Sequence, residues 1–139
     1  MKTIISKVLL GAMFASASMA AHAVCTDPPR QFVDWAGCTK TGVDAGKSAV
    51  LFGANLVQGN FSGLYLGRAQ LAYVNALGAN FSNVDFSEAN LTNANLFKAN
   101  VTGAIWKDAN LAGARWVDGT ICEGTILGQC HVNQLLKQF

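Results

Sequence analysis

From residue 49 onward, apolar side chains recur at every fifth position of the chain. A small residue, Ala or Gly in most repeats, stands two positions before each large one, and Asn most often lies between the two. The large positions are Leu51, Leu56, Phe61, Leu66, Leu71, Ala76, Phe81, Phe86, Leu91, Leu96, Val101, Trp106, Leu111, Trp116, Ile121 and Ile126. Tandem units of one fixed length predict a repeat architecture.

The spacing of the apolar residues selects the backbone shape. Two residues apart, the small and the large side chain lie on the same side of an extended segment. Because five is an odd number, this alternation breaks at each repeat, so one long flat strand cannot carry it. In an α-helix, five residues turn by about 140°, and the large side chains would wind around the helix. The pattern therefore predicts short extended pieces joined by bends, with both apolar residues facing a common axis.

Columns of equivalent residues give the length of one turn. At a spacing of twenty residues the large position is Leu four times, at positions 51, 71, 91 and 111. Where Ala76 interrupts the column that holds Leu56 and Leu96, the paired small site has grown to Val74, a volume exchange that a packed core tolerates. We expect four sides per turn and four coils over residues 49–128, stacked at about 4.8 Å.

The Ala-Asn-Leu units resemble those of the pentapeptide-repeat proteins; they occur at Ala54-Asn55-Leu56, Ala89-Asn90-Leu91 and Ala109-Asn110-Leu111. The resemblance implies an all-β fold, a right-handed quadrilateral β-helix (a β-solenoid) with the large residues and the preceding Ala inside. The flanks at 33–38 and 118–130 look like those of exported members. The family implies no common activity, since its best-known members mimic DNA and many others have no assigned role.

Residues 1–23 have the features of a bacterial signal peptide. Lys2 and Lys7 precede an apolar run, and Ala21-His22-Ala23 forms a small-x-small cleavage site. The run is too short to span a bilayer as a helix, and Val24 is too bulky for lipoprotein processing at Cys25. We therefore predict cleavage after Ala23 and a periplasmic or secreted protein with no membrane anchor. Its parts would be an N-terminal cap (24–48), the solenoid (49–128) and a C-terminal cap (129–139).

Four cysteines follow the predicted signal peptide: Cys25, Cys38, Cys122 and Cys130. An even number in an oxidising compartment predicts two disulfides. A zinc site is the alternative, but the C-x₂-C spacing is absent and only one histidine, His131, follows the cleavage site. Four coils would place the two ends of the solenoid about 20 Å apart, whereas a disulfide needs Cα atoms within about 7 Å. We expect Cys25–Cys38 at one end and Cys122–Cys130 at the other.

The last residues follow a different pattern. Val132, Leu135, Leu136 and Phe139 have the spacing of one face of a short amphipathic helix. Such a short helix is marginal alone, so we expect it to dock, either over the last coil or along one side.

One outward column is apolar: Val57, Leu77, Phe97 and Val117. We call these four residues the apolar stripe; it runs beside the amides of Asn55, Asn75 and Asn95. One interpretation is a docking surface for a partner protein or a second copy. The other is that the C-terminal helix or the segment 32–35 folds over it.

Charge and the lack of reactive clusters limit the function. The formal net charge is +2, and loss of Lys2 and Lys7 leaves eight basic against eight acidic residues, a net charge of zero. No basic stripe suits nucleic acid, and a solenoid packed with Leu and Phe leaves no pocket for catalysis. We predict an exported structural or protein-interaction scaffold without catalytic, cofactor or metal site. The alternative, a DNA mimic that inhibits or protects a topoisomerase, is disfavoured by the neutral charge and by export.

Overall fold

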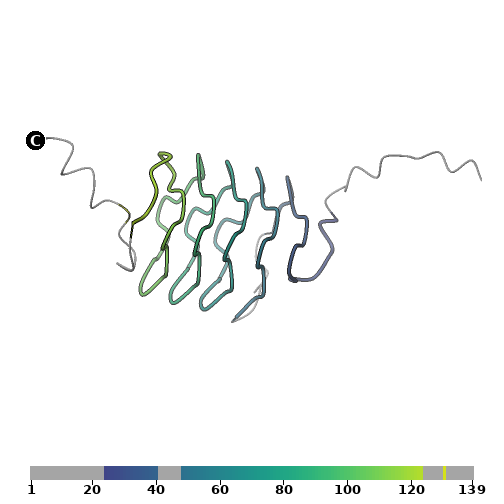
Figure 1. Cartoon of the computed structure of the whole chain (residues 1–139). Coiled ribbons are helices and arrows are strands. Elements are labelled where there is room, and N and C mark those ends of the chain that lie inside the picture. Colours follow the sequence, from purple (N-terminus) through teal and green to yellow (C-terminus); the bar gives the residue numbers. More distant parts are fainter. Residues whose placement is uncertain (1–23, 41–47, 124–129, 131–139) are drawn as a thin grey trace, which may run out of the picture.

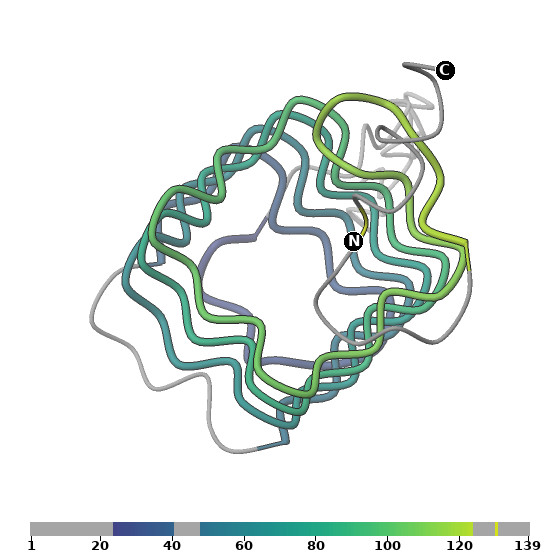
Figure 2. The ribbon, with the colours of Figure 1, turned by 90° about the vertical axis from the view of Figure 1, so that its left-hand side faces the viewer.

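The computed structural model describes residues 24–40, 48–123 and 130. The chain winds through these residues in coils that stack along one axis (Figure 1), and the view along that axis shows a four-sided outline (Figure 2). Isolated parallel β-bridges join neighbouring coils, and no longer strand and no helix occurs in the described residues. The predicted signal peptide (1–23) and the predicted helix at 132–139 lie outside them.

The bridges have the twenty-residue spacing that the sequence predicts. On one side Val50 pairs with Gln70, Gln70 with Asn90, and Asn90 with Asn110. The N–H of Leu51 donates to the carbonyl oxygen of Gln70 at 2.9 Å, and the N–H of Gln70 donates back to Ala49 at 2.8 Å. Both the N–H and the carbonyl group of Gln70, the middle residue between the small and the large position, therefore face the preceding coil. The same ladder repeats on every side.

A β-turn closes each five-residue unit. The N–H of Ala54 donates to the carbonyl oxygen of Leu51 at 3.0 Å, and Gly53 between them has a φ of +64°. Non-glycine residues occupy the same left-handed conformation in other turns, for example Gln58 and Lys98. Each such residue costs roughly 1–2 kcal/mol in backbone strain. The free energy gained from inward packing and from the ladder of hydrogen bonds must exceed this cost.

The core consists of the small and large positions that the repeat predicts to be inside. Leu51, Leu71, Leu91 and Leu111 are all buried, and so is the pair Val74 and Ala76, whose volumes complement each other. An aromatic row crosses the coils in the order Trp35, Phe61, Phe81, Phe86, Trp106 and Trp116, with neighbouring ring centroids between 4.5 and 6.3 Å apart. Rings at these separations add a specific attraction to the burial of apolar area.

The ladder begins before the regular repeats. Asp34 bridges to Asn55 and Thr39 to Asn60, with a spacing of twenty-one instead of twenty. Val33 and Trp35 occupy inside positions and are buried. Part of the segment that we assigned to the N-terminal cap is therefore wound like a coil of the solenoid.

The predicted inward position of Ile121 is wrong. Its side chain is 52% exposed and its backbone forms an antiparallel bridge with Arg115, whereas the neighbouring Cys122 is buried. The chain reverses at Gly119, whose φ is +92°. The N–H of Cys122 then donates to Ala114, and the N–H of Gly113 donates to Cys122, both at 2.8 Å. The returning segment thus supplies the backbone partners that a further coil would have given; Ile126 lies outside the described residues.

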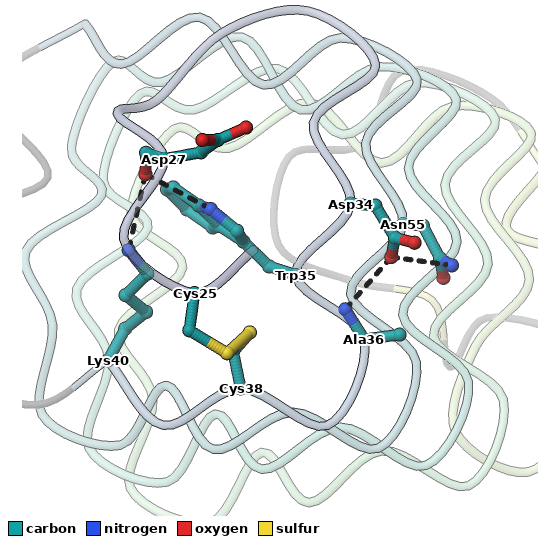
Figure 3. The surroundings of a disulfide bond; sticks show 8 residues. All are labelled: Cys25, Asp27, Asp34, Trp35, Ala36, Cys38, Lys40 and Asn55. Atoms are coloured by element: carbon teal, nitrogen blue, oxygen red, sulfur yellow. Dashed lines mark hydrogen bonds between the residues drawn. A yellow bond between two sulfur atoms is a disulfide. The ribbon is translucent and has the colours of Figure 1, made fainter. Parts of the chain in front are cut away.

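The two disulfides pair as predicted, Cys25 with Cys38 and Cys122 with Cys130. Figure 3 shows the first one beside Trp35. The carbonyl oxygen of Asp27 accepts hydrogen bonds from the Trp35 indole at 3.2 Å and from the Lys40 ammonium at 3.3 Å. The ammonium also lies 4.2 Å from the centroid of the Trp35 ring. Residues 25–27 therefore hold the first ring of the aromatic row in place.

Candidate functional site

The second side of the solenoid, which carries the middle residues 55, 75 and 95, has an ordered row of amides. The Asn95 side chain donates to the side-chain oxygen of Asn75 at 3.1 Å, and Asn55 donates likewise to Asp34 at 3.0 Å. Each of these side-chain oxygens accepts a backbone N–H from two residues further on, at Ala36, Val57, Leu77 and Phe97. This Asx-turn geometry fixes the backbone of the apolar stripe.

The apolar stripe is a continuous column. The carbonyl oxygens of its residues accept hydrogen bonds from the preceding coil, in the pairs Gly37 with Val57, Gln58 with Leu77, Gly78 with Phe97, and Lys98 with Val117. All four stripe residues are half-buried. The structure therefore brings the predicted residues together at one-coil intervals, with part of every side chain open to solvent.

The segment 32–35 does not cover the stripe. Val33 and Trp35 point inward, and the Phe32 ring packs edge-on against Phe52, with centroids 5.7 Å apart. The other proposed cover, the C-terminal helix, lies outside the described residues.

Two cations surround the aromatic residue of the stripe. The Arg115 guanidinium carbon lies 4.2 Å from the centroid of the Phe97 ring, and the Lys98 ammonium lies 5.3 Å from it. A Cβ added at Gly119 would come within 3.3 Å of the same ring, so the lack of a side chain at Gly119 leaves room for the ring. We did not foresee this group from the sequence. The signal was present, because Arg115 stands where the column of middle residues otherwise holds Asn.

A second exposed group involves the corner before this side. The rings of Phe52 and Tyr73 lie 5.4 Å apart, and Phe32 adds a third ring. Phe32 is 66% and Tyr73 57% exposed, and both have positive φ values of 55° and 60°. Bulky residues are strained in this conformation. The repeat pattern does not predict the trio, although Tyr73 shares a column with Gly53 and Asn93.

No three His, Cys, Asp or Glu residues in the described part of the chain are grouped to hold a metal ion, and no helix there has the length and hydropathy to cross a membrane. Glu88 receives two hydrogen bonds from Arg68, at 2.9 and 3.2 Å. The hydrogen bond and the charge of Glu88 raise the pKa of the Arg68 guanidinium. The pair is exposed and contributes little to stability.

Comparisons with known proteins agree with this geometry. The family model described as "Pentapeptide repeats" matches residues 49–87, 65–103 and 89–115. A pentapeptide repeat protein of the Arabidopsis thaliana thylakoid lumen is 30% identical, with a TM-score of 0.50; the match covers 66% of this chain and 68% of that one. Rfr23 from the cyanobacterium Cyanothece is 21% identical, also with a TM-score of 0.50, and 65% of each chain is covered.

HetL, a pentapeptide repeat protein involved in heterocyst differentiation regulation in the cyanobacterium Nostoc, is 36% identical with a TM-score of 0.43. That match covers 64% of this chain and 43% of HetL, so the chain spans less than half of HetL. A search of curated proteins found no match. The thylakoid-lumen neighbour implies a right-handed quadrilateral β-helix, and its 30% identity, together with the family model, shows that this chain belongs to the pentapeptide-repeat family.

Proposed function

We propose that the protein is an exported, non-enzymatic scaffold that holds a partner protein on its second side, along the apolar stripe. The observation that carries this proposal is the column of four half-buried apolar side chains beside an amide row. An apolar column on an outer face is a candidate interaction site.

The backbone beneath the stripe favours binding. Every stripe residue is held by a ladder hydrogen bond, and the bond from Gly78 to Phe97 is 2.9 Å long. A surface that is already ordered loses little conformational entropy when a partner docks. The same surface carries amides and two cations, whereas a DNA mimic requires a long acidic face. Binding of a protein segment is therefore favoured over topoisomerase inhibition or protection.

The cysteine pairing supports export. Two disulfides persist in an oxidising compartment and are rare in the cytosol, and both pairs lie within bonding distance, with Cα–Cα separations of 5.4 and 4.6 Å. Intact mass spectrometry tests this part of the proposal on protein recovered from the producing cells. We expect a chain that begins at Val24, and a mass that still includes residues 1–23 would contradict export.

The docking role predicts that Leu77→Asp weakens partner binding at least tenfold without unfolding the protein, because a charge would replace an apolar contact in the middle of the stripe. A photoactivatable group at position 77 captures the partner, and titration calorimetry with the purified partner then compares variants. Ser82→Asp is the matched control, since Ser82 holds the equivalent turn position on the next side of the same coil. Equal affinities of the Leu77 and Ser82 variants would refute the docking role.

A further inference from the structure

Two cations lie beside the stripe at Phe97. Arg115 and Lys98 both lie against the Phe97 ring, at 4.2 and 5.3 Å. Among residues 24–40, 48–123 and 130, the ion pairs are Arg30 with Asp27 and Arg68 with Glu88. Neither cation of the Phe97 group belongs to them. Asp118 follows Lys98 one coil later, and its Oδ1 accepts hydrogen bonds from the backbone and hydroxyl of Thr120.

The position of Arg115 suits an incoming carboxylate. A guanidinium that lies over a ring uses its face for that contact and keeps its N–H groups at the edge. The edge has the planar fork that binds a carboxylate through two parallel hydrogen bonds. Because the ring already restrains the Arg115 side chain, less rotational freedom is lost on binding.

The surroundings indicate what carries this carboxylate. From Phe97 the stripe continues to Leu77 and Val57, and the corner residues beside those two are the uncharged Gly78 and Gln58. A nucleic acid or an anionic membrane would require cations along the whole length. A ligand with one anionic group and a row of apolar groups fits better.

We propose that Phe97, Arg115 and Lys98 form a carboxylate-binding site for an extended peptide segment of the partner. The apolar side chains of this segment lie along Leu77 and Val57, and its carboxylate meets Arg115 and Lys98. The inference rests on the proposed docking role of the stripe and specifies the chemistry of the partner.

Three fluorescein-labelled heptapeptides that alternate Leu and Thr test this inference by fluorescence anisotropy at low salt. One ends in Glu with an amidated terminus, one in Gln with an amidated terminus, and one in Gln with a free terminal carboxylate. We expect the Glu peptide to bind the disulfide-intact protein about tenfold more tightly than the amidated Gln peptide. The third peptide distinguishes a side-chain carboxylate from a terminal one.

Charge-removing variants assign the selectivity to the site. Arg115→Gln should abolish the preference for the carboxylate, and Lys98→Gln should reduce it. Lys107→Gln is the matched control, because it removes one exposed cation from another side. If Arg115→Gln lowers the midpoint of thermal unfolding in circular dichroism, this variant is destabilised. The carboxylate preference of Lys98→Gln alone then tests the site.

The outcomes separate this inference from the docking role. If all three peptides bind equally, or if Lys107→Gln reduces the preference as much as Lys98→Gln does, the carboxylate site is refuted and docking on the stripe stands. If the peptides bind and Leu77→Asp changes none of the affinities, the stripe itself is refuted. If none of the peptides binds the wild-type protein, the peptide inference is refuted.

Discussion

Replacing Phe86 by Ala should lower the free energy of unfolding by about 3–5 kcal/mol. Phe86 is 1% exposed and lies in the middle of the aromatic row, stacked on Trp106 at 4.5 Å and edge-on to Phe81 at 5.3 Å. The ladder of hydrogen bonds holds the coils at a fixed spacing. The surrounding backbone therefore cannot close the cavity that the missing ring leaves. Denaturant-induced unfolding followed by circular dichroism measures the change.

Tyr73→Ala is the control for loss of an aromatic ring. Tyr73 lies outside the core with more than half of its surface exposed, and its φ is +60°. We expect a change within about 0.5 kcal/mol, as for most surface substitutions. Equal losses in the Phe86 and Tyr73 variants would show that the aromatic row is not the stabilising feature.

Removing the first disulfide with Cys25→Ala and Cys38→Ala should lower the free energy of unfolding by about 3 kcal/mol, from the entropy of a loop whose ends are thirteen residues apart. The loss should be local at first. Without the covalent link, residues 25–27 no longer hold Trp35 through Asp27. Native-state hydrogen exchange should therefore show faster exchange at the amide of Trp35, which donates to Asn55.

The other disulfide provides the comparison. Cys122→Ala with Cys130→Ala opens a loop with a separation of only eight residues, for which we expect about 2.5 kcal/mol. Faster exchange should then appear at Gly113 and Trp116, which donate to the returning segment. If the Trp35 amide responded equally to both double variants, the disulfides would act on the whole solenoid and not on their own surroundings.

The interior of the solenoid could be predicted from the sequence because every five-residue unit places its small and its large residue in the same environment. Even the exception at Ala76 could be interpreted, since Val74 fills the volume next to it. The cysteine pairing followed from the same geometry, because coils stacked along one axis keep the two ends apart. Such inferences need only distances along the chain.

The remaining features depend on contacts that repeat periodicity does not report. Ile121 has the right residue type at the right interval, but the backbone reversal at Gly119 turns it outward. The coil at Asp34 escaped notice because its spacing of twenty-one breaks the phase. Arg115 contacts Phe97 from the next coil, and the exception in its column did not show which residue it would meet.

Because the bridges join residues twenty apart, each outer column repeats every twenty residues, whereas the large residues of the interior repeat every five. Adding one unit of five residues would leave every large side chain facing the axis, yet would move each later outer residue to the adjoining side. The stripe residues that follow the added unit would then lie on the adjoining side, a quarter turn away from those that precede it. Whole turns can be gained or lost without this effect, so the surface pattern restricts length changes to multiples of twenty while the core accepts any multiple of five.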